Sequence, residues 1–538
     1  MQEVSEQWKN AHKQTLLNES FVEVSLGVAD PDALADASSR DNGAVYISDT
    51  PLVVSEVDKS VVPYCTLEQN LWLLDGGRKA IPESNYGDCG YISDVLCDDT
   101  CVFSGKMPVI TIDFTKTFTN LIPGITITWG ASHGEFADNF IMRAYDGEEI
   151  VAEKEVIGNR STKSLVVVDI ARYNRIVIQV KKWCLPNHRA RVEEIFVGLD
   201  KVYGKADLFD YSHTQSVSPV SISLPKIEIK FSVDNVDGEY NPYNANGLAK
   251  YLMERQEVKA RYGLKLDDGT VEWIKGGTFY LSEWYAKQNG MTADFTARDL
   301  LEFMSATYHD SITEITSRSL YDLAVSVLES ANLPLNSDGT KKWVVDGSLE
   351  DIDTNAPLPE DSQANCLQLI ANAGRCAIIQ DRNGTLRIEP LKFDANDYKI
   401  DSFNSYSKPE ITLSKPVKQV CVKVYTYTKG DDGIKSTTSE MYYPEQVANN
   451  IVGETITIDN PLITDVYEAY SLGEWLYTHL GHRMTLDASW RAGVRLDALD
   501  IITSENAYSI EQVRMTDVEY RYNGAFRATG KGKVIEDG

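Results

Sequence analysis

The sequence is poor in cysteine and in long apolar runs, and each shortage excludes a class of protein. Its 538 residues include eight cysteines, too few and too irregularly spaced for a disulfide scaffold, so we expect reduced thiols. No stretch approaches the roughly 18 uninterrupted apolar residues of a membrane span. Residues 1–13 are too polar for a signal peptide. We therefore expect a protein that is made and kept soluble in a cytoplasm, without a membrane partner.

Positive charge is also scarce. Lys and Arg together number 52 against 80 Asp and Glu, which gives a formal net charge of −28. This balance argues against functions that depend on neutralising phosphates, so stable DNA binding is not expected. An acidic surface would suit a conduit through which DNA slides without sticking, although solubility alone can explain the same composition.

Motifs for metal binding and catalysis are weak or missing. Cys89, Cys97 and Cys101 form no C-x-x-C pair and have no histidine among them, which favours buried or loop thiols over a zinc site. His479 and His482 lie three residues apart without a third ligand in view, so histidines near a helix end are the simpler interpretation. No H-E-x-x-H, no Cys/His peptidase signature and no convincing carboxylate pair occurs. We predict no catalytic, cofactor-binding or metal-binding residues and no enzyme activity.

Two short motifs resemble functional sites but are better explained as turns. Residues 130–134 (GASHG) match the G-x-S-x-G nucleophile elbow, which requires a strand, a sharp turn and a helix, whereas another strand is expected from Asn139. Residues 234–238 (DNVDG) suggest a calcium loop, but Val236 breaks the alternation of ligands and a tight Asp-Gly turn accounts for them.

The N-terminal third begins with a helix and a few strands. Val4, Trp8 and Ala11 share one face of an expected helix within residues 1–18. Alternating apolar residues predict strands at Ser20–Val28 and Leu52–Val57. Since two strands make no stable domain, they must pair with later strands.

Residues 106–198 contain at least six short strands separated by turns, which predicts a jelly-roll sandwich. The strings ITIDFTKTFTNLIPGITITW, YNRIVIQVKKW and ARVEEIFVG resemble the discoidin or carbohydrate-binding jelly roll. Ligands of that class sit on loop residues, and the exposed candidates for glycan contact are Trp129, His133, Trp183 and His188. The alternative is that the two tryptophans end core strands.

Residues 192–304 alternate in short apolar runs closed by turn clusters, which predicts a small antiparallel barrel or sandwich with helices at Asn246–Arg255 and Thr296–Phe303. The segments FSVDNVDGEYNPYN (231–244) and GGTFYLSEW (276–284) resemble tail-tip or baseplate hub proteins of tailed phages that infect Gram-positive bacteria. Residues 62–76 (VPYCTLEQNLWLLDG) resemble the segment that precedes an inserted sugar-binding-like module in such proteins.

The later part of the chain is helical and then returns to strands. Apolar stripes predict helices around Leu320–Ala331 and Cys366–Gly374, Asn383-Gly384 predicts a hairpin, and Thr464 caps a helix ending at Gly481. Strands are expected at Val417–Tyr427, Ser439–Tyr443, Leu496–Thr503, Ile510–Tyr520 and Ala525–Gly530.

The predicted fold is mainly β with inserted helices (α+β): two tail-tube-like β-barrels, a jelly-roll insertion and a helical section. The expected parts are a helix at 1–18, the first strands of barrel one at 19–66, a linker at 67–105, the jelly roll at 106–198, the rest of barrel one at 199–310, the helical section at 311–375, and barrel two at 376–538 with a helix inserted at 464–481.

The resemblance implies a structural protein of the virion, located at the tail tip after synthesis in the host bacterial cytoplasm. Such a hub closes or caps the tail tube, forms part of the DNA conduit and anchors the parts that contact the host. The partners it implies are two further copies in a homotrimer, the distal tail protein and tail tube, the tape measure protein, and a tail fibre or receptor-binding protein. The alternative is a receptor-binding tail protein that recognises host surface glycans through the jelly roll.

Overall fold

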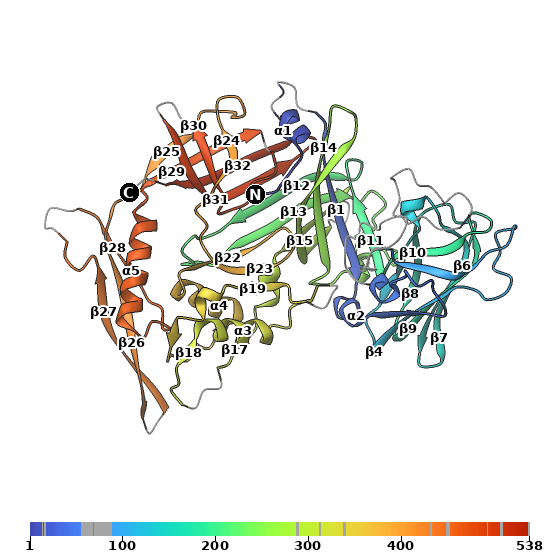
Figure 1. The fold of residues 1–538 in the computed structure, drawn as a ribbon, viewed down its shortest axis with the longest axis horizontal. Helices are drawn as coiled ribbons and strands as arrows, with labels where there is room; N and C mark the ends of the chain where they lie inside the picture. The colour runs from blue at the N-terminus through green and yellow to red at the C-terminus, as the bar shows by residue number, and fades with distance from the viewer. Residues whose placement is uncertain are drawn as a thin grey trace.

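The computed structural model describes the chain except residues 13, 15–17, 55–67, 69–88, 287–289, 311–313, 337–339, 431–432, 448–451, 492, 506–508 and 536–538. A large sheet occupies the middle of the molecule, a β-sandwich lies at one end, and a long hairpin with a helix lies at the other (Figure 1). This arrangement confirms the predicted fold class, mainly β with inserted helices. Within the described residues, no helix is long and apolar enough to cross a membrane.

The central sheet has 13 strands, and 11 of them follow one hydrogen-bonded path. In the order of that path they are β11 (Gly198–Tyr203), β1 (Ser20–Ala29), β14 (Glu257–Lys265), β15 (Val271–Ala286), β16 (Thr292–Arg298), β13 (Lys226–Asp234), β12 (Leu208–Ser216), β31 (Ile510–Tyr522), β32 (Phe526–Val534), β29 (Met484–Arg491) and β25 (Glu410–Leu413). Two more strands branch from β31: β30 (Ile501–Glu505), and β24 (Ala395–Ile400) beside it.

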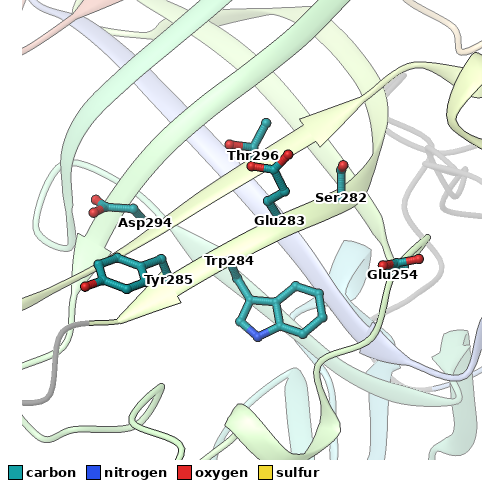
Figure 2. Close-up of a pocket in the computed structure, with 7 residues that line it drawn as sticks. All are labelled: Glu254, Ser282, Glu283, Trp284, Tyr285, Asp294 and Thr296. Carbon is teal, nitrogen blue, oxygen red and sulfur yellow. The ribbon is translucent and has the colours of Figure 1, made fainter.

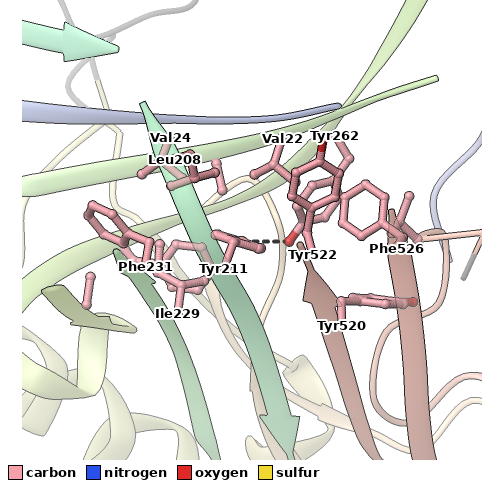
Figure 3. Close-up of a cluster of buried hydrophobic side chains, with 14 of the residues drawn as sticks. Val22, Val24, Leu208, Tyr211, Ile229, Phe231, Tyr262, Tyr520, Tyr522 and Phe526 are labelled. Carbon is pink, nitrogen blue, oxygen red and sulfur yellow. Dashed lines mark hydrogen bonds between the residues drawn. The ribbon is translucent and has the colours of Figure 1, made fainter. Parts of the chain in front are cut away.

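The two expected barrels are not separate in this sheet. Strand β12 from the first set pairs with β31 from the second, in a register running from Tyr211 opposite Tyr522 to Ser216 opposite Asp517. Both sets bury side chains in one core cluster, in which the hydroxyls of Tyr211 and Tyr262 are 2.8 Å apart (Figure 3). Because the edge strands of the two sets pair with each other, the described strands form one continuous sheet. The path of this sheet runs from β11 at one end to β25 at the other.

The N-terminal helix α1 (Glu6–His12) docks on this core as predicted, although it is shorter than residues 1–18. The side chains of Trp8 and Ala11 are buried in the core cluster, and Val4 packs against it. The expected strand Ser20–Val28 is confirmed as β1.

The sandwich consists of two antiparallel sheets that enclose their own core. One sheet has the order β2 (Ser38–Asp41), β4 (Val109–Phe118), β9 (Tyr173–Trp183), β6 (Ala137–Asp146) and β7 (Glu149–Ile157), and the other β3 (Tyr91–Leu96), β10 (Arg189–Phe196), β5 (Ile122–Trp129) and β8 (Lys163–Ile170).

Residues before 106 also contribute to the sandwich. Its core includes Ala33 of α2 (Pro31–Asp36), Val53 of the 3₁₀ helix η1 (Thr50–Val54), and Tyr91 of β3. A strand at Leu52–Val57 was therefore a wrong prediction in its described part, since Leu52 to Val54 are helical. The segment 62–76 lies outside the described residues except for Glu68.

The helical section packs beneath the large sheet, and its core is separate from that of the sheet (Figure 1). The predicted helices are confirmed as α3 and α4, and the Asn383-Gly384 hairpin is confirmed, with Gly384 at φ +82°. The elements are β17 (Thr307–Tyr308), β18 (Arg318–Ser319), α3 (Leu320–Ser330), β19 (Trp343–Val345), η5 (Gly347–Leu349), β20 (Asp353–Thr354), β21 (Asp361–Ser362), α4 (Gln363–Ala373), β22 (Cys376–Gln380) and β23 (Leu386–Pro390).

The far end of the molecule is a long hairpin covered by a helix (Figure 1). Strand β26 (Val417–Gly430) lies between β27 (Gly433–Tyr443) and β28 (Glu454–Ile458), and α5 (Val466–Gly481) packs on β26. The helix begins after Asp465, whose carboxylate accepts the backbone N–H groups of Tyr467 and Glu468, so the predicted cap at Thr464 is wrong by one residue.

Two other expected helices are replaced by single 3₁₀ turns. Within Asn246–Arg255 only η3 (Ala249–Tyr251) is helical, and residues 296–298 continue β16 before η4 (Leu300–Phe303) begins. At η4 the Asp299 carboxylate accepts the N–H of Leu301, which starts a helix only after the strand has ended. For residues 296–298, pairing with β13 and β15 decided the outcome, whereas residues 246–255 form turns around η3 and no strand.

Candidate functional site

Three of the four candidate glycan-contact residues are buried in the sandwich. Trp129 and Trp183 end β5 and β9 with 0% of their surface exposed, and their rings meet edge to face at 6.1 Å. Their indole N–H groups donate to Ser164 Oγ and Glu135 Oε2, each at 2.8 Å. His188 is buried too, and of the four only His133 is partly exposed. The expectation that all four are exposed is therefore wrong, and the tryptophans end core strands.

A buried ionic cluster lies beside Trp183. Arg191 on β10 approaches Glu68 at 2.8 Å and Glu135 at 4.0 Å, and all three side chains are nearly inaccessible. Burial raises the pKa of Glu135, and the Arg191 guanidinium and the Trp183 N–H oppose this rise. Because a charge in such a site needs a partner, the cluster fixes Glu68 against the sandwich.

The G-x-S-x-G segment forms a turn, as predicted. Residues 131–133 make a single 3₁₀ turn (η2, Ala131–His133) that leads into β6. Ser132 Oγ lies 2.6 Å from Glu193 Oε1 and 2.9 Å from His133 Nδ1. In a catalytic triad the carboxylate orients the histidine, whereas here it contacts the serine. The arrangement therefore differs from that of a catalytic triad.

The 234–238 loop also has the geometry of a turn. The Asn235 N–H donates to Met291 O at 2.8 Å, and its side-chain oxygen accepts the Tyr240 N–H at 2.9 Å. Gly238 adopts φ +67°, which favours glycine. Hydrogen bonding within the loop thus accounts for these residues, and the described part of the chain contains no cluster of three or more metal-ligating side chains.

His479 is a packed aromatic residue at the end of α5. Its ring lies 5.3 Å from that of Trp475 and 6.3 Å from that of His482. Burial lowers the pKa of His479 to about 4, with a further contribution from Arg514, so the imidazole is neutral near pH 7.

An open groove of about 440 Å³ lies at the end of β15 and β16, and sequence reasoning did not identify it. Figure 2 shows Glu283, Trp284 and Tyr285 along β15, Asp294 and Thr296 on the neighbouring strand, and Glu254 on a nearby loop. The ladder shifts register between Leu281 and Glu283, and such a bulge changes the direction of the side chains that follow. In the structure, six consecutive buried residues on β15 are followed, after Ser282, by three exposed ones, Glu283, Trp284 and Tyr285.

The groove combines aromatic surface with negative charge. Tyr285 is 60% exposed and Trp284 37% exposed. Glu283 accepts a hydrogen bond from Arg298 at 3.0 Å, and Asp294 accepts one from Ser232. Three carboxylates and two aromatic rings around one depression are suited to contact a cationic group, since rings attract cations over their faces.

Comparisons with known proteins find similarity among solved structures. No protein-family model matches the chain, and no curated protein matches it. The chain is similar to a 43 kDa tail protein of prophage MuSo2 from Shewanella oneidensis, with 12% identity over 62% of this chain and 95% of that chain and a TM-score of 0.42. A tail protein from Neisseria meningitidis MC58 gives 10% identity, 63% and 94% coverage and a TM-score of 0.43.

Prophage tail protein gp18 from Listeria monocytogenes EGD-e gives 10% identity, 62% and 91% coverage and a TM-score of 0.39. A Gram-positive host and a discoidin-type insertion stay predictions from the sequence.

Proposed function

We propose that the chain is a structural protein of a phage virion, a tail-tip or baseplate hub that caps the tail tube and forms part of the DNA conduit. It is made in the host bacterial cytoplasm and acts in the tail tip. Three copies surround a central channel, bind the tube and the distal tail protein above, contact the tape measure protein, and anchor a tail fibre or receptor-binding protein. Each chain then offers two similar sets of strands, which allows a threefold ring to meet a sixfold tube.

The observation that carries the proposal is the single sheet made by both halves of the chain. It joins the N-terminal and C-terminal strand sets through β12 and β31 over one shared core. The two sequence segments that resemble hub proteins both contribute to this core, Phe231 and Tyr240 from the first and Phe279 and Leu281 from the second. A continuous sheet of this kind suits a component of a tube wall.

Three basic groups on the polar face of this sheet lie beside carboxylates, which supports the proposed conduit. On β13, Lys226 and Lys230 flank Glu228 at 3.0 and 3.3 Å. On β31, Arg521 lies 2.8 Å from Glu519. Basic groups that are already paired with carboxylates offer little to phosphates, and the free energy of DNA binding depends mainly on such phosphate contacts.

Most of the residues that suggested glycan binding are not accessible to a ligand. Trp129, Trp183 and His188 are buried, and the two tryptophan N–H groups are hydrogen-bonded inside the sandwich. A sugar ring cannot stack on an aromatic face that the core already covers.

Native mass spectrometry of the purified protein, with tail tips assembled from the purified components, tests the proposed assembly. We expect three copies of this chain in each tip. Tips that contain a single copy, or six copies in one ring, would contradict it.

A further inference from the structure

The end of β15 has a free edge. Its ladder with β14 ends where Tyr280 lies opposite Glu257, but the strand continues to Ala286 and pairs with β16. Among the described residues, no strand pairs with the other edge of Ser282–Ala286. The free edge is five residues long, or about 17 Å at 3.4 Å per residue, which is the length of an ordinary strand.

Such an edge is a template for pairing with another chain. Its backbone groups can bind an extended peptide, and neighbouring side chains then select among peptides. Natural proteins protect exposed edges with charged side chains, especially lysine, with proline, with bulges or with a covering segment. The Ser282–Ala286 sequence, SEWYA, contains neither lysine nor proline; its one charged residue, Glu283, follows the bulge, and two partly exposed aromatic side chains lie beside it.

The groove beside this edge indicates the charge of the peptide. Glu254, Glu283 and Asp294 line it together with Trp284 and Tyr285 (Figure 2). Arg298 neutralises part of this charge through Glu283, and no ion pair of Glu254 is found among the described residues. A peptide with basic side chains at alternate positions would face these carboxylates along one side.

A second copy of this chain is a poor occupant. The same groove placed against itself would bring carboxylates of the two copies together, and the chain carries a formal net charge of −28. Like charges brought close together across an interface are unfavourable.

We propose that Ser282–Ala286 of β15 binds an extended, positively charged peptide segment of another protein, which pairs with it as an added strand. The basic side chains of that segment lie against Glu254, Glu283 and Asp294, and the side chains between them face the Trp284 ring, because Trp284 points to the opposite side of the strand from Glu283. The proposal rests on local geometry and does not require that the protein is a tail component.

Fluorescence anisotropy tests this with a defined probe, a fluorescein-labelled, N-acetylated heptapeptide in which arginine alternates with valine. The full chain should bind it, and a matched peptide with glutamate in place of arginine should bind at least about tenfold more weakly. The triple variant Glu254→Gln/Glu283→Gln/Asp294→Asn should also weaken binding about tenfold, since each exposed charge pair contributes modestly. Trp284→Ala should reduce affinity as well, with circular dichroism confirming that the variant is folded.

Two controls separate strand pairing from plain charge attraction. The arginine peptide is made in two versions, N-methylated on one or the other alternate set of backbone nitrogens. Only one set can point toward β15, so one version should lose binding and the other keep it. Glu148→Gln/Glu149→Gln, on the exposed β6–β7 turn, should leave affinity unchanged. No binding of the arginine peptide, equal loss in this control variant, or unchanged binding by both N-methylated versions would overturn the proposal.

Discussion

Removing the Arg382 guanidinium should destabilise both halves of the central sheet together. Arg382 lies in the β22–β23 turn with 3% of its side chain exposed, and its Nε is 2.7 Å from Asp497. It also donates to the carbonyls of Lys275, Val494 and Leu496 at 3.0, 2.8 and 2.8 Å. Lys275 belongs to the N-terminal strand set, and the other partners belong to the C-terminal half. The substitution Arg382→Met keeps most of the volume but leaves the Asp497 carboxylate with only the N-terminal ammonium of Met1, 4.0 Å away, as a cation.

The expected loss is large because the pair is buried. Removing one partner of a buried ion pair costs about 3–5 kcal/mol. For a domain of this size each kcal/mol lowers Tm by about 2–4 °C, so we expect a fall of roughly 6–20 °C in the main calorimetric transition. Hydrogen exchange in peptides covering β12 and β31 should accelerate together by about a hundredfold or more.

Lowering the pH should reduce the difference in Tm between the wild type and Arg382→Met. Burial alone would raise the pKa of Asp497, but the Arg382 guanidinium, the N-terminal ammonium and a hydrogen bond from Gln2 together outweigh it and the pKa is lowered. A group with a depressed folded-state pKa contributes stability above its unfolded value of about 3.9 and loses that contribution as pH falls through the folded value. The Tm gap between wild type and Arg382→Met should therefore be full near pH 7 and shrink below about pH 3.9.

Arg387→Met is the matched control. Arg387 contacts Asp381 at 2.9 Å on the same hairpin, but its side chain is 34% exposed. A pair that is this accessible is worth about 0–1 kcal/mol, so Tm should fall by no more than about 4 °C. Equal effects of the two substitutions, or faster exchange in β31 without β12, would refute the idea that the two strand sets share one cooperative core.

Three further predictions concern the sandwich, the polar face and the core. Replacing residues 30–197 by Asn-Gly should leave the large sheet folded, because Ala29 and Gly198 lie opposite each other in the sheet and a two-residue turn can join them. Circular dichroism measures this, and a thermal melt without a cooperative transition would contradict it. In a low-salt gel-shift, neither the full chain nor that deletion should retain double-stranded DNA, and retention by the deletion would argue against the conduit. Phe231→Ala, 2% exposed and stacked on Phe295, should cost about 3–5 kcal/mol in calorimetry, whereas Tyr467→Ala at 84% exposure should change little.

The strands of the sandwich could be predicted because their pattern is local. The stretch ITIDFTKTF, which begins the first jelly-roll string, lies entirely within strand β4, and Asn383-Gly384 specified its hairpin by turn chemistry alone. The pairing of β12 with β31 could not be predicted in the same way. Alternation tells which side chains are buried, but it does not tell which distant strand lies alongside.

The predicted exposure of the glycan-contact residues was wrong for a related reason. Trp129 and Trp183 stand at strand ends, where a sequence cannot separate a core position from a loop position, and their N–H partners Ser164 and Glu135 are 35 and 48 residues away. The groove depends on β15 extending past β14, which is a property of two strands together.

Electron microscopy of the virion with this protein labelled tests the central claim most directly. Gold-labelled antibody against the chain should bind at the tip of the tail, and averaged images of the tip should show threefold density around a channel. Label on the head or along the tail shaft, or virions that lack the protein, would contradict the proposed hub.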